Sequence, residues 1–116
     1  MDKLTMDKLT RYATIIKTIL QEDGQHKPSH GDITPLLVFD DQHHSYQLMY
    51  VGWDRRRRVH GSIYHLRLEN NKIYIEEDTS NQPIAESLLA AGVPKEDIVL
   101  AFHAPDKRQY TDFALA

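Results

Sequence analysis

In the first part of the chain, apolar residues recur every three or four positions, which is the spacing of one face of an α-helix. This spacing predicts an amphipathic helix over about residues 6–23, ending near Gly24. Pro28 and Gly31 then predict a loop. The residues on the apolar face are Leu9, Tyr12, Ile16, Ile19 and Leu20.

From Leu36 onward the hydrophobic pattern has a period of two, as in a β-strand. It predicts strands over residues 36–39, 46–53, 59–68 and 72–77. Short turns join the later strands, and Asn70-Asn71 suits a two-residue hairpin, so the four strands should form an antiparallel meander. One face of the third strand should carry His60, Ser62, Tyr64, Leu66 and Leu68.

A second helix should begin at Asn81-Gln82-Pro83 and end at Gly92. Residues 98–102 form a short apolar segment, and the aromatic residues of the following tail suggest that it packs against the domain. The predicted fold class is α+β, with an N-terminal helix, a four-stranded antiparallel meander sheet, a second helix and a short C-terminal segment. We expect the helices to cover one face of the sheet.

Length and composition agree with one globular domain spanning residues 1–116. Hydrophobic residues make up 41% of the 116 positions and charged residues 27%, which excludes a disordered chain. No apolar run approaches the roughly 18 residues of a membrane span. With no cysteine and a net charge of −3, we expect a cytoplasmic protein that does not coat nucleic acid with its whole surface.

Met1–Thr5 is repeated as Met6–Thr10, so residues 1–5 should be a dispensable extension.

Four consecutive arginines form the most distinctive local feature. Arg55, Arg56, Arg57 and Arg58 should lie at a hairpin tip beside Trp53, where they could contact phosphates or acidic side chains. The alternatives are a solvated turn that discourages pairing at the strand edge, and a tryptophan that belongs to the core. Arg57 and Arg58 should point to opposite faces of the sheet.

The sequence offers little support for catalysis or metal binding. The serines have no visible histidine partner, the glycines are scattered, and no cysteine is present. Among the seven histidines, His26 and His30 are separated by Pro28, which opposes a helical ligand pair. His43-His44 lacks a recognisable metal-ligand spacing. We therefore expect no enzyme, no metal and no cofactor. An acidic cluster, Glu76-Glu77-Asp78, ends the fourth strand.

Several segments together resemble the XisI family. The resemblance runs in order from about residue 6 through nearly the whole chain, and Ala101 and Ala104 depart from the glycine and proline expected there. The matching segments are Tyr12 with Ile15-Ile16 and Ile19-Leu20, Tyr46-Gln-Leu48, Val51-Gly-Trp53, Arg57-Arg-Val-His-Gly61, Lys72-Ile-Tyr-Ile75, Gly92-Val-Pro-Lys-Glu-Asp-Ile-Val-Leu100, Phe102-His103 and Lys107-Arg-Gln-Tyr-Thr-Asp-Phe-Ala114.

The resemblance implies a cyanobacterial fdxN element excision controlling factor. Such proteins are accessory to a recombinase that removes a DNA element during heterocyst differentiation, and they typically occur beside a XisH-like protein with a nuclease-like fold. The leading hypothesis is a non-enzymatic regulator that binds a XisH-like partner. The alternatives are a direct DNA-binding recombination factor and an antitoxin-like neutraliser that uses the acidic cluster. A homo-oligomer is also possible through an exposed sheet edge.

The residues expected to contact a partner or nucleic acid lie in two parts of the sequence. The first part is the arginine run with its neighbouring tryptophan, and the second is the C-terminal tail, with two adjacent basic residues and a tyrosine close to them. The full set is Trp53, Arg55, Arg56, Arg57, Arg58, Lys107, Arg108 and Tyr110.

Overall fold

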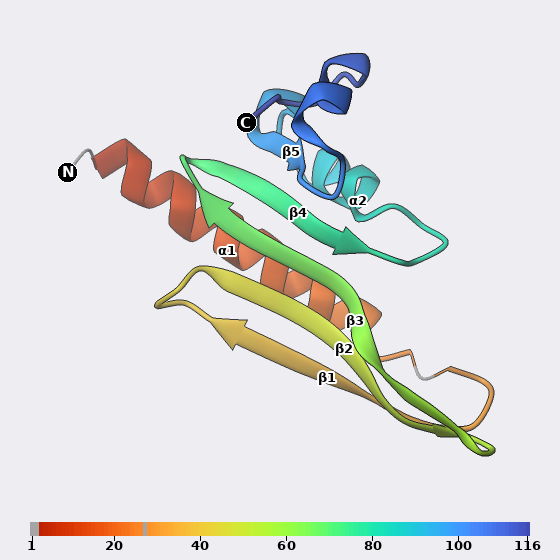
Figure 1. The fold of residues 1–116 in the computed structure, drawn as a ribbon. Coiled ribbons are helices and arrows are strands. Elements are labelled where there is room, and N and C mark those ends of the chain that lie inside the picture. The colour runs from red at the N-terminus through yellow and green to blue at the C-terminus, as the bar shows by residue number, and fades with distance from the viewer. Residues whose placement is uncertain (1–2, 27) are drawn as a thin grey trace.

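The computed structural model describes residues 3–26 and 28–116, with side chains from residue 8 onward. The described residues form two α-helices, five strands and two short 3₁₀ turns, η1 and η2 (Figure 1). The elements are α1 (Lys3–Asp23), β1 (Asp32–Asp40), β2 (Ser45–Asp54), β3 (Arg57–Glu69), β4 (Lys72–Asp78), α2 (Ile84–Ala90), η1 (Lys95–Asp97), β5 (Ile98–Leu100) and η2 (Pro105–Tyr110). Residues 1 and 2 lie outside the described part, so the dispensability of residues 1–5 stays a prediction.

The five strands form one sheet in the order β1-β2-β3-β4-β5. The predicted antiparallel meander is confirmed for β1 to β4, but the prediction of only four strands was wrong, because β5 pairs parallel to β4. A parallel neighbour needs a crossover connection, and α2 with η1 supplies it. With three residues, β5 is too short to show an alternating pattern in the sequence.

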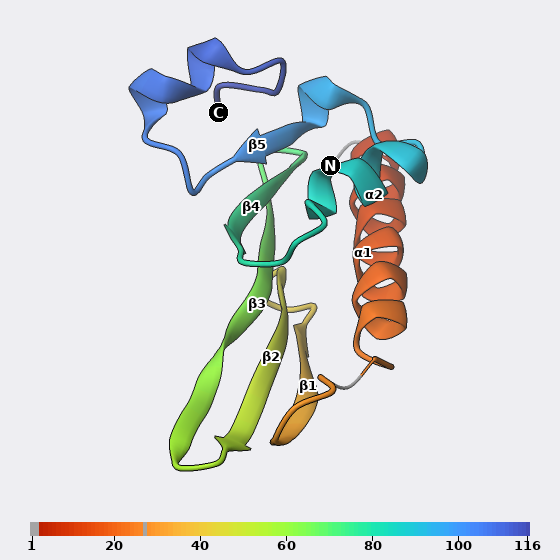
Figure 2. The same cartoon turned by 90° about the vertical axis from the view of Figure 1, so that its right-hand side faces the viewer.

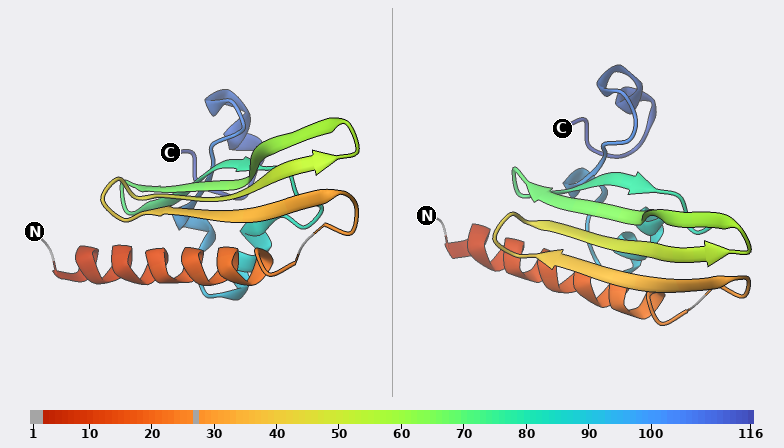
Figure 3. Two further views of the ribbon diagram at one scale, coloured as in Figure 1. Left: turned by 90° about the horizontal axis from the view of Figure 1, so that it is seen from below. Right: turned by 60° about the horizontal axis from the view of Figure 1, so that its bottom comes forward.

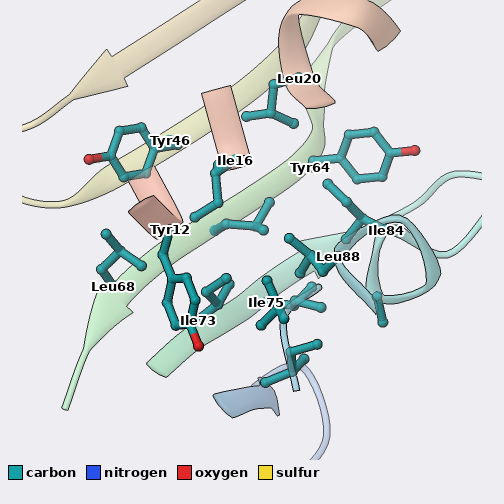
Figure 4. Close-up of a cluster of buried hydrophobic side chains, with 14 of the residues drawn as sticks. Tyr12, Ile16, Leu20, Tyr46, Tyr64, Leu68, Ile73, Ile75, Ile84 and Leu88 are labelled. Atoms are coloured by element: carbon teal, nitrogen blue, oxygen red, sulfur yellow. The ribbon is translucent and has the colours of Figure 1, made fainter. Parts of the chain in front are cut away.

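Helix α1 lies across one face of the sheet, and α2 lies on the same side (Figures 2 and 3). Tyr12, Ile16 and Leu20 are fully buried, as the helical spacing predicted. They meet side chains from β2, β3, β4 and α2 in one cluster (Figure 4). Burial of one large apolar side chain contributes about 1.5–3 kcal/mol, so this helix face is a major source of stability. The buried strand residues include Tyr46, Leu48, Leu66, Ile73 and Ile75.

Two matching polar clamps fix α1 to the sheet. Lys17 Nζ contacts Asp41 at 2.6 Å, and the hydroxyl of Tyr46 donates to the same carboxylate at 2.7 Å. Nearer the start of α1, Lys8 Nζ lies 2.9 Å from the Asp97 carboxylate, which also accepts a hydrogen bond from the Tyr12 hydroxyl. The helix is therefore tied both to the β1–β2 turn and to the residue before β5.

The clamp formed by Lys8, Tyr12 and Asp97 changes the pKa values of Tyr12 and Asp97. Burial, assisted by the hydrogen bond to Asp97, raises the pKa of Tyr12 to about 12, so the phenol stays a donor. Burial opposes ionisation of Asp97, but hydrogen bonds from Lys8 and Tyr12 and the positive charges of Lys8 and Lys72 outweigh it. The pKa of Asp97 therefore lies below its ordinary value.

The described residues cover the opposite face of the sheet only at its β4–β5 end. Beyond β5 the chain rises on the side away from α1 (Figure 3). Tyr74 and Val99 are buried there, although neither belongs to the cluster under the helices. The tail returns to pair beside β5, where the Ala114 N–H donates to the Ile98 carbonyl at 2.9 Å. The predicted packing of the tail is thus observed for Phe113, which packs against the core cluster, but not for Tyr110, which is exposed. Neither described helix is long and apolar enough to cross a membrane.

Gly52 lets β1 and β2 approach closely near their outer ends. Its φ of 150° is rarely adopted by residues with a side chain. A Cβ at this position would lie 2.0 Å from the Asp32 carbonyl oxygen and 2.8 Å from the Ile33 Cα. Since both neighbours are backbone atoms of a paired strand, they cannot move away without breaking the β1–β2 pairing.

We predict that Gly52→Ala lowers the free energy of unfolding by about 3 kcal/mol, because it adds both a clash and an unfavourable φ. Gly61→Ala is the matched control, since a Cβ there meets no atom within 4 Å. That control should change stability by less than about 1 kcal/mol. Urea unfolding of both variants measures the difference, and equal effects would contradict this explanation.

We also predict that Asp97→Asn destabilises the protein at neutral pH. Because the folded pKa of Asp97 is lowered, its stabilisation is present above the unfolded value of about 3.9 and is lost as pH falls through the folded pKa. The stability gap between wild type and variant should therefore narrow below about pH 4. Urea unfolding as a function of pH measures this gap. Asp112→Asn, at an exposed carboxylate, should leave the profile unchanged, and a gap that does not depend on pH would contradict the assignment.

Candidate interaction surface

The residues predicted to bind a partner fall into two separate regions. The β2–β3 hairpin projects beyond the end of α1 as an arm, defined here as residues 49–62, and carries the arginine run at its tip (Figure 2). The C-terminal tail lies at the opposite end of the sheet (Figures 1 and 2). The fold therefore does not bring the two predicted sets together.

The four arginines at the tip differ in their contacts. Arg57 lies 3.4 Å from the Asp54 carboxylate, whereas Arg58 stacks over the Trp53 ring at 5.3 Å and donates to the Gly52 carbonyl at 3.2 Å. The prediction that these two side chains point to opposite faces is thus confirmed. Arg55 and Arg56 form the exposed turn, and Arg55 has a positive φ of 59°. Within the described residues, only Arg57 of the four forms an ion pair.

The tail residues also differ in role. Arg108 donates to the backbone carbonyls of Ala101, His103 and Leu115, at 3.3, 3.0 and 3.1 Å. These bonds hold the tail in shape, so the guanidinium is occupied within the chain. Lys107 is exposed, and Tyr110 is 79% exposed. Lys107 and Tyr110 thus remain accessible to a partner.

A patch of apolar side chains covers the side of β1 and β2 that faces away from α1. We call this side of β1, β2 and β3 the open face. Trp53 is 50% exposed, so it is not the core residue considered as an alternative, and Leu36 and Val38 are each 42% exposed. Met49 and Val51 are half-buried between them. This apolar patch consists of Leu36, Val38, Met49, Val51 and Trp53.

The patch is uncovered because of the fold. Both helices lie on the other side, and the tail covers only β4 and β5 (Figure 3). The solvent face of an antiparallel sheet is normally polar, so a contiguous apolar patch there is typical of an interaction site. The sequence also indicates this patch, although the alternating pattern used to predict the strands does not. Leu36-Leu-Val-Phe39 is apolar at four consecutive positions, so both faces of β1 must be apolar.

Charges flank the patch unequally. On β1, Asp32 and Asp40 lie at the two ends of the open face, and hydrogen bonds from His43, first from its backbone N–H, hold the pKa of Asp40 below its ordinary value. On β3 the same face carries basic residues together with Ser62 and, at the end of the strand, Glu69. Arg67 is partly neutralised by Glu69 and Glu76, at 3.2 and 3.5 Å. The basic residues of β3 are Arg58, His60, His65 and Arg67.

The acidic cluster at the end of β4 is largely engaged within the chain. Asp78 accepts hydrogen bonds from the backbone N–H of Ile84 at 2.7 Å and of Ser80 at 3.0 Å, so it caps the start of α2. Glu76 pairs with Arg67. Among the described residues, no three or more histidine or acidic side chains come close enough to hold a metal ion.

Comparison with known proteins agrees with this architecture. The model of the XisI protein family matches residues 6–115. A search of curated proteins found no match. A crystal structure of a XisI-like protein from Anabaena variabilis ATCC 29413 has a TM-score of 0.87 and 35% identity, covering 93% of this chain and 99% of its own. The fdxN element excision controlling factor XisI from the same organism has a TM-score of 0.80 and 38% identity, over 94% and 99% of the two chains. On the match to the family model and the agreement in fold, this chain belongs to the XisI family.

Proposed function

We propose that this protein is a non-enzymatic accessory factor in the excision of a DNA element and that it acts by binding a XisH-like protein. The observation that carries this proposal is the exposed tip of the arm. Arg55 and Arg56 stand beyond the end of the helical layer, next to the Trp53–Arg58 stack (Figure 2). Arginine and tryptophan are the residue types that most often dominate the binding energy of protein interfaces.

The chemistry of the tip favours an acidic contact on the partner. A guanidinium presents a planar fork of donors that matches a carboxylate. Only Arg57 of the run is paired with a carboxylate of the described chain, so the other guanidinium groups can pair with a partner without first breaking an internal ion pair. Arg55 also holds a backbone conformation that favours glycine, so an arginine there is unfavourable for the isolated turn.

The two alternatives are supported unequally. A neutraliser acting through the acidic cluster loses support, because Glu76 and Asp78 are already engaged within the chain. Direct DNA binding would use the same guanidinium groups on phosphates. It is distinguished by its salt dependence, since log affinity for duplex DNA falls by about 0.9 per phosphate contacted for each tenfold rise in salt.

We predict that co-expression with a XisH-like protein gives a stoichiometric complex in affinity pull-down and light scattering. Arg55→Glu combined with Arg56→Glu should weaken the complex by at least about tenfold, since each lost charged contact is worth about 1.5–3 kcal/mol. Arg11→Glu combined with Lys95→Glu is the matched control, because it makes the same change in net charge on exposed residues away from the arm.

Two separate proteins at both low and high salt would overturn the proposal. If the control pair weakens the complex equally, the net charge of the chain determines the affinity and the arginine tip does not. Tight, salt-sensitive binding of the chain to duplex DNA without the XisH-like protein would favour the alternative instead. Lys107→Glu, measured in parallel, tests whether the exposed tail shares the interface.

A further inference from the structure

We propose that the open face of β1, β2 and β3 binds the same face of a second copy of this chain, forming a twofold-symmetric dimer. The exposed turn Arg55–Arg56 stands beyond the apolar patch, whereas Trp53 and Arg58 adjoin both surfaces, and the dimer can be tested on this chain alone. The inference rests on the composition of the open face, on the arrangement of charge across it and on the absence of a covering layer in the described chain.

The apolar patch is continuous across two strands. In the β1–β2 register Leu36 faces Met49, Thr34 faces Val51 and Asp32 faces Trp53, so the apolar residues adjoin directly or diagonally. Two sheets that pack face to face interdigitate such residues at a spacing of about 10 Å. A second open face is a suitable cover, since it presents the same apolar band.

Charge on the open face is arranged in strips. Asp32 and Asp40 lie at the two ends of β1, the apolar band spans β1 and β2, and β3 carries basic residues, of which Arg67 is paired with Glu69 at the end of that strand. A twofold axis parallel to the strands, between β1 and β2, would place β1 of each copy over β2 of the other. Leu36 would then meet Met49 of the second copy, and Arg58 would extend toward Asp32 of that copy. The symmetry makes each of these contacts twice.

The other way to stack the two faces is electrostatically unfavourable. An axis across the strands would place each strand over its own copy in the reverse direction. Asp32 would then lie near Asp40 of the second copy, and Arg58 near Arg67. Like charges placed together at an interface oppose binding, so charge selects the axis parallel to the strands.

Pairing through the β1 edge is also unfavourable. Pro35 lies in the middle of β1 and has no N–H to donate to an added strand. Two β1 strands paired antiparallel about Leu36 would again place Asp32 opposite Asp40, at both ends of the pair. The tail lies over β4 and β5, on the far side of β3 from the patch, so it leaves β1 and β2 free (Figure 3).

The purified chain, without any partner, tests this proposal by light scattering and sedimentation over a wide concentration range. We expect twice the mass of one chain. Leu36→Asp should raise the dimer dissociation constant by at least about tenfold. Leu37→Asp is the matched control, because Leu37 is the next residue of β1, has the same 42% exposure and faces the helix side. It should leave the dimer intact.

A charge exchange tests the axis itself. Asp32→Arg and Arg58→Asp should each weaken the dimer, whereas the double variant should restore it to within about threefold of the wild type, because the pair is re-formed with reversed sign. Thermal unfolding checks that each variant is folded, and Leu36→Thr replaces Leu36→Asp if the latter does not fold.

A monomer at all concentrations would overturn the proposal, as would a dimer that Leu37→Asp weakens as much as Leu36→Asp. Failure of the double variant to restore association would overturn the proposed arrangement of the two faces. None of these outcomes depends on the XisH-like protein, so failure of the dimer and failure of the proposed function are separate results.

Discussion

The packing of α1 against one side of the sheet is the constraint from which the rest of the structure follows. Tyr12, Ile16 and Leu20 bury the helix against the strands, and two lysine–aspartate–tyrosine clamps tie it to the β1–β2 turn and to the residue before β5. A single helix and the short α2 can cover only one face of five strands. The other face must therefore be polar, be covered by another segment or be left apolar and exposed. The tail covers β4 and β5, and the open face of β1 to β3 remains exposed (Figure 3).

The arm follows from the same geometry. Strands β2 and β3 are 10 and 13 residues long, and both extend past the end of α1. None of the described residues of the arm belongs to the buried cluster, and the start of β1 supports the arm by close backbone contact at Gly52. That support keeps the arginine tip at a fixed position relative to the sheet. A tip held in place loses less conformational entropy on binding than a free loop would.

Local patterns predicted the elements whose geometry is set locally. The apolar stripe gave α1, and Asn70-Asn71 forms the predicted turn with φ values of 53° and 61°. Long-range pairing was harder to predict, since nothing within residues 98–100 reveals a parallel neighbour. The third strand shows the same limit. An unbroken alternation groups Ser62 with Tyr64, but the β2–β3 register shifts between Leu48, which pairs with Tyr64, and Met49, which pairs with Ser62, so the two residues face opposite sides. The arginine run was visible in the sequence, whereas the apolar patch depends on knowing which face the helices cover.

The axis proposed for the dimer has a consequence for the arms. An axis parallel to the strands leaves both arginine tips at the same end of the assembly, whereas an axis across the strands would place them at opposite ends. Each chain has a net charge of −3, so the two tips would form a local basic site on an acidic particle. Their mutual repulsion weakens the dimer, and an acidic surface that spans both tips would relieve it. Relief of this repulsion would link partner binding to dimer formation, while Arg55 and Arg56 of the tip stay outside the dimer contact.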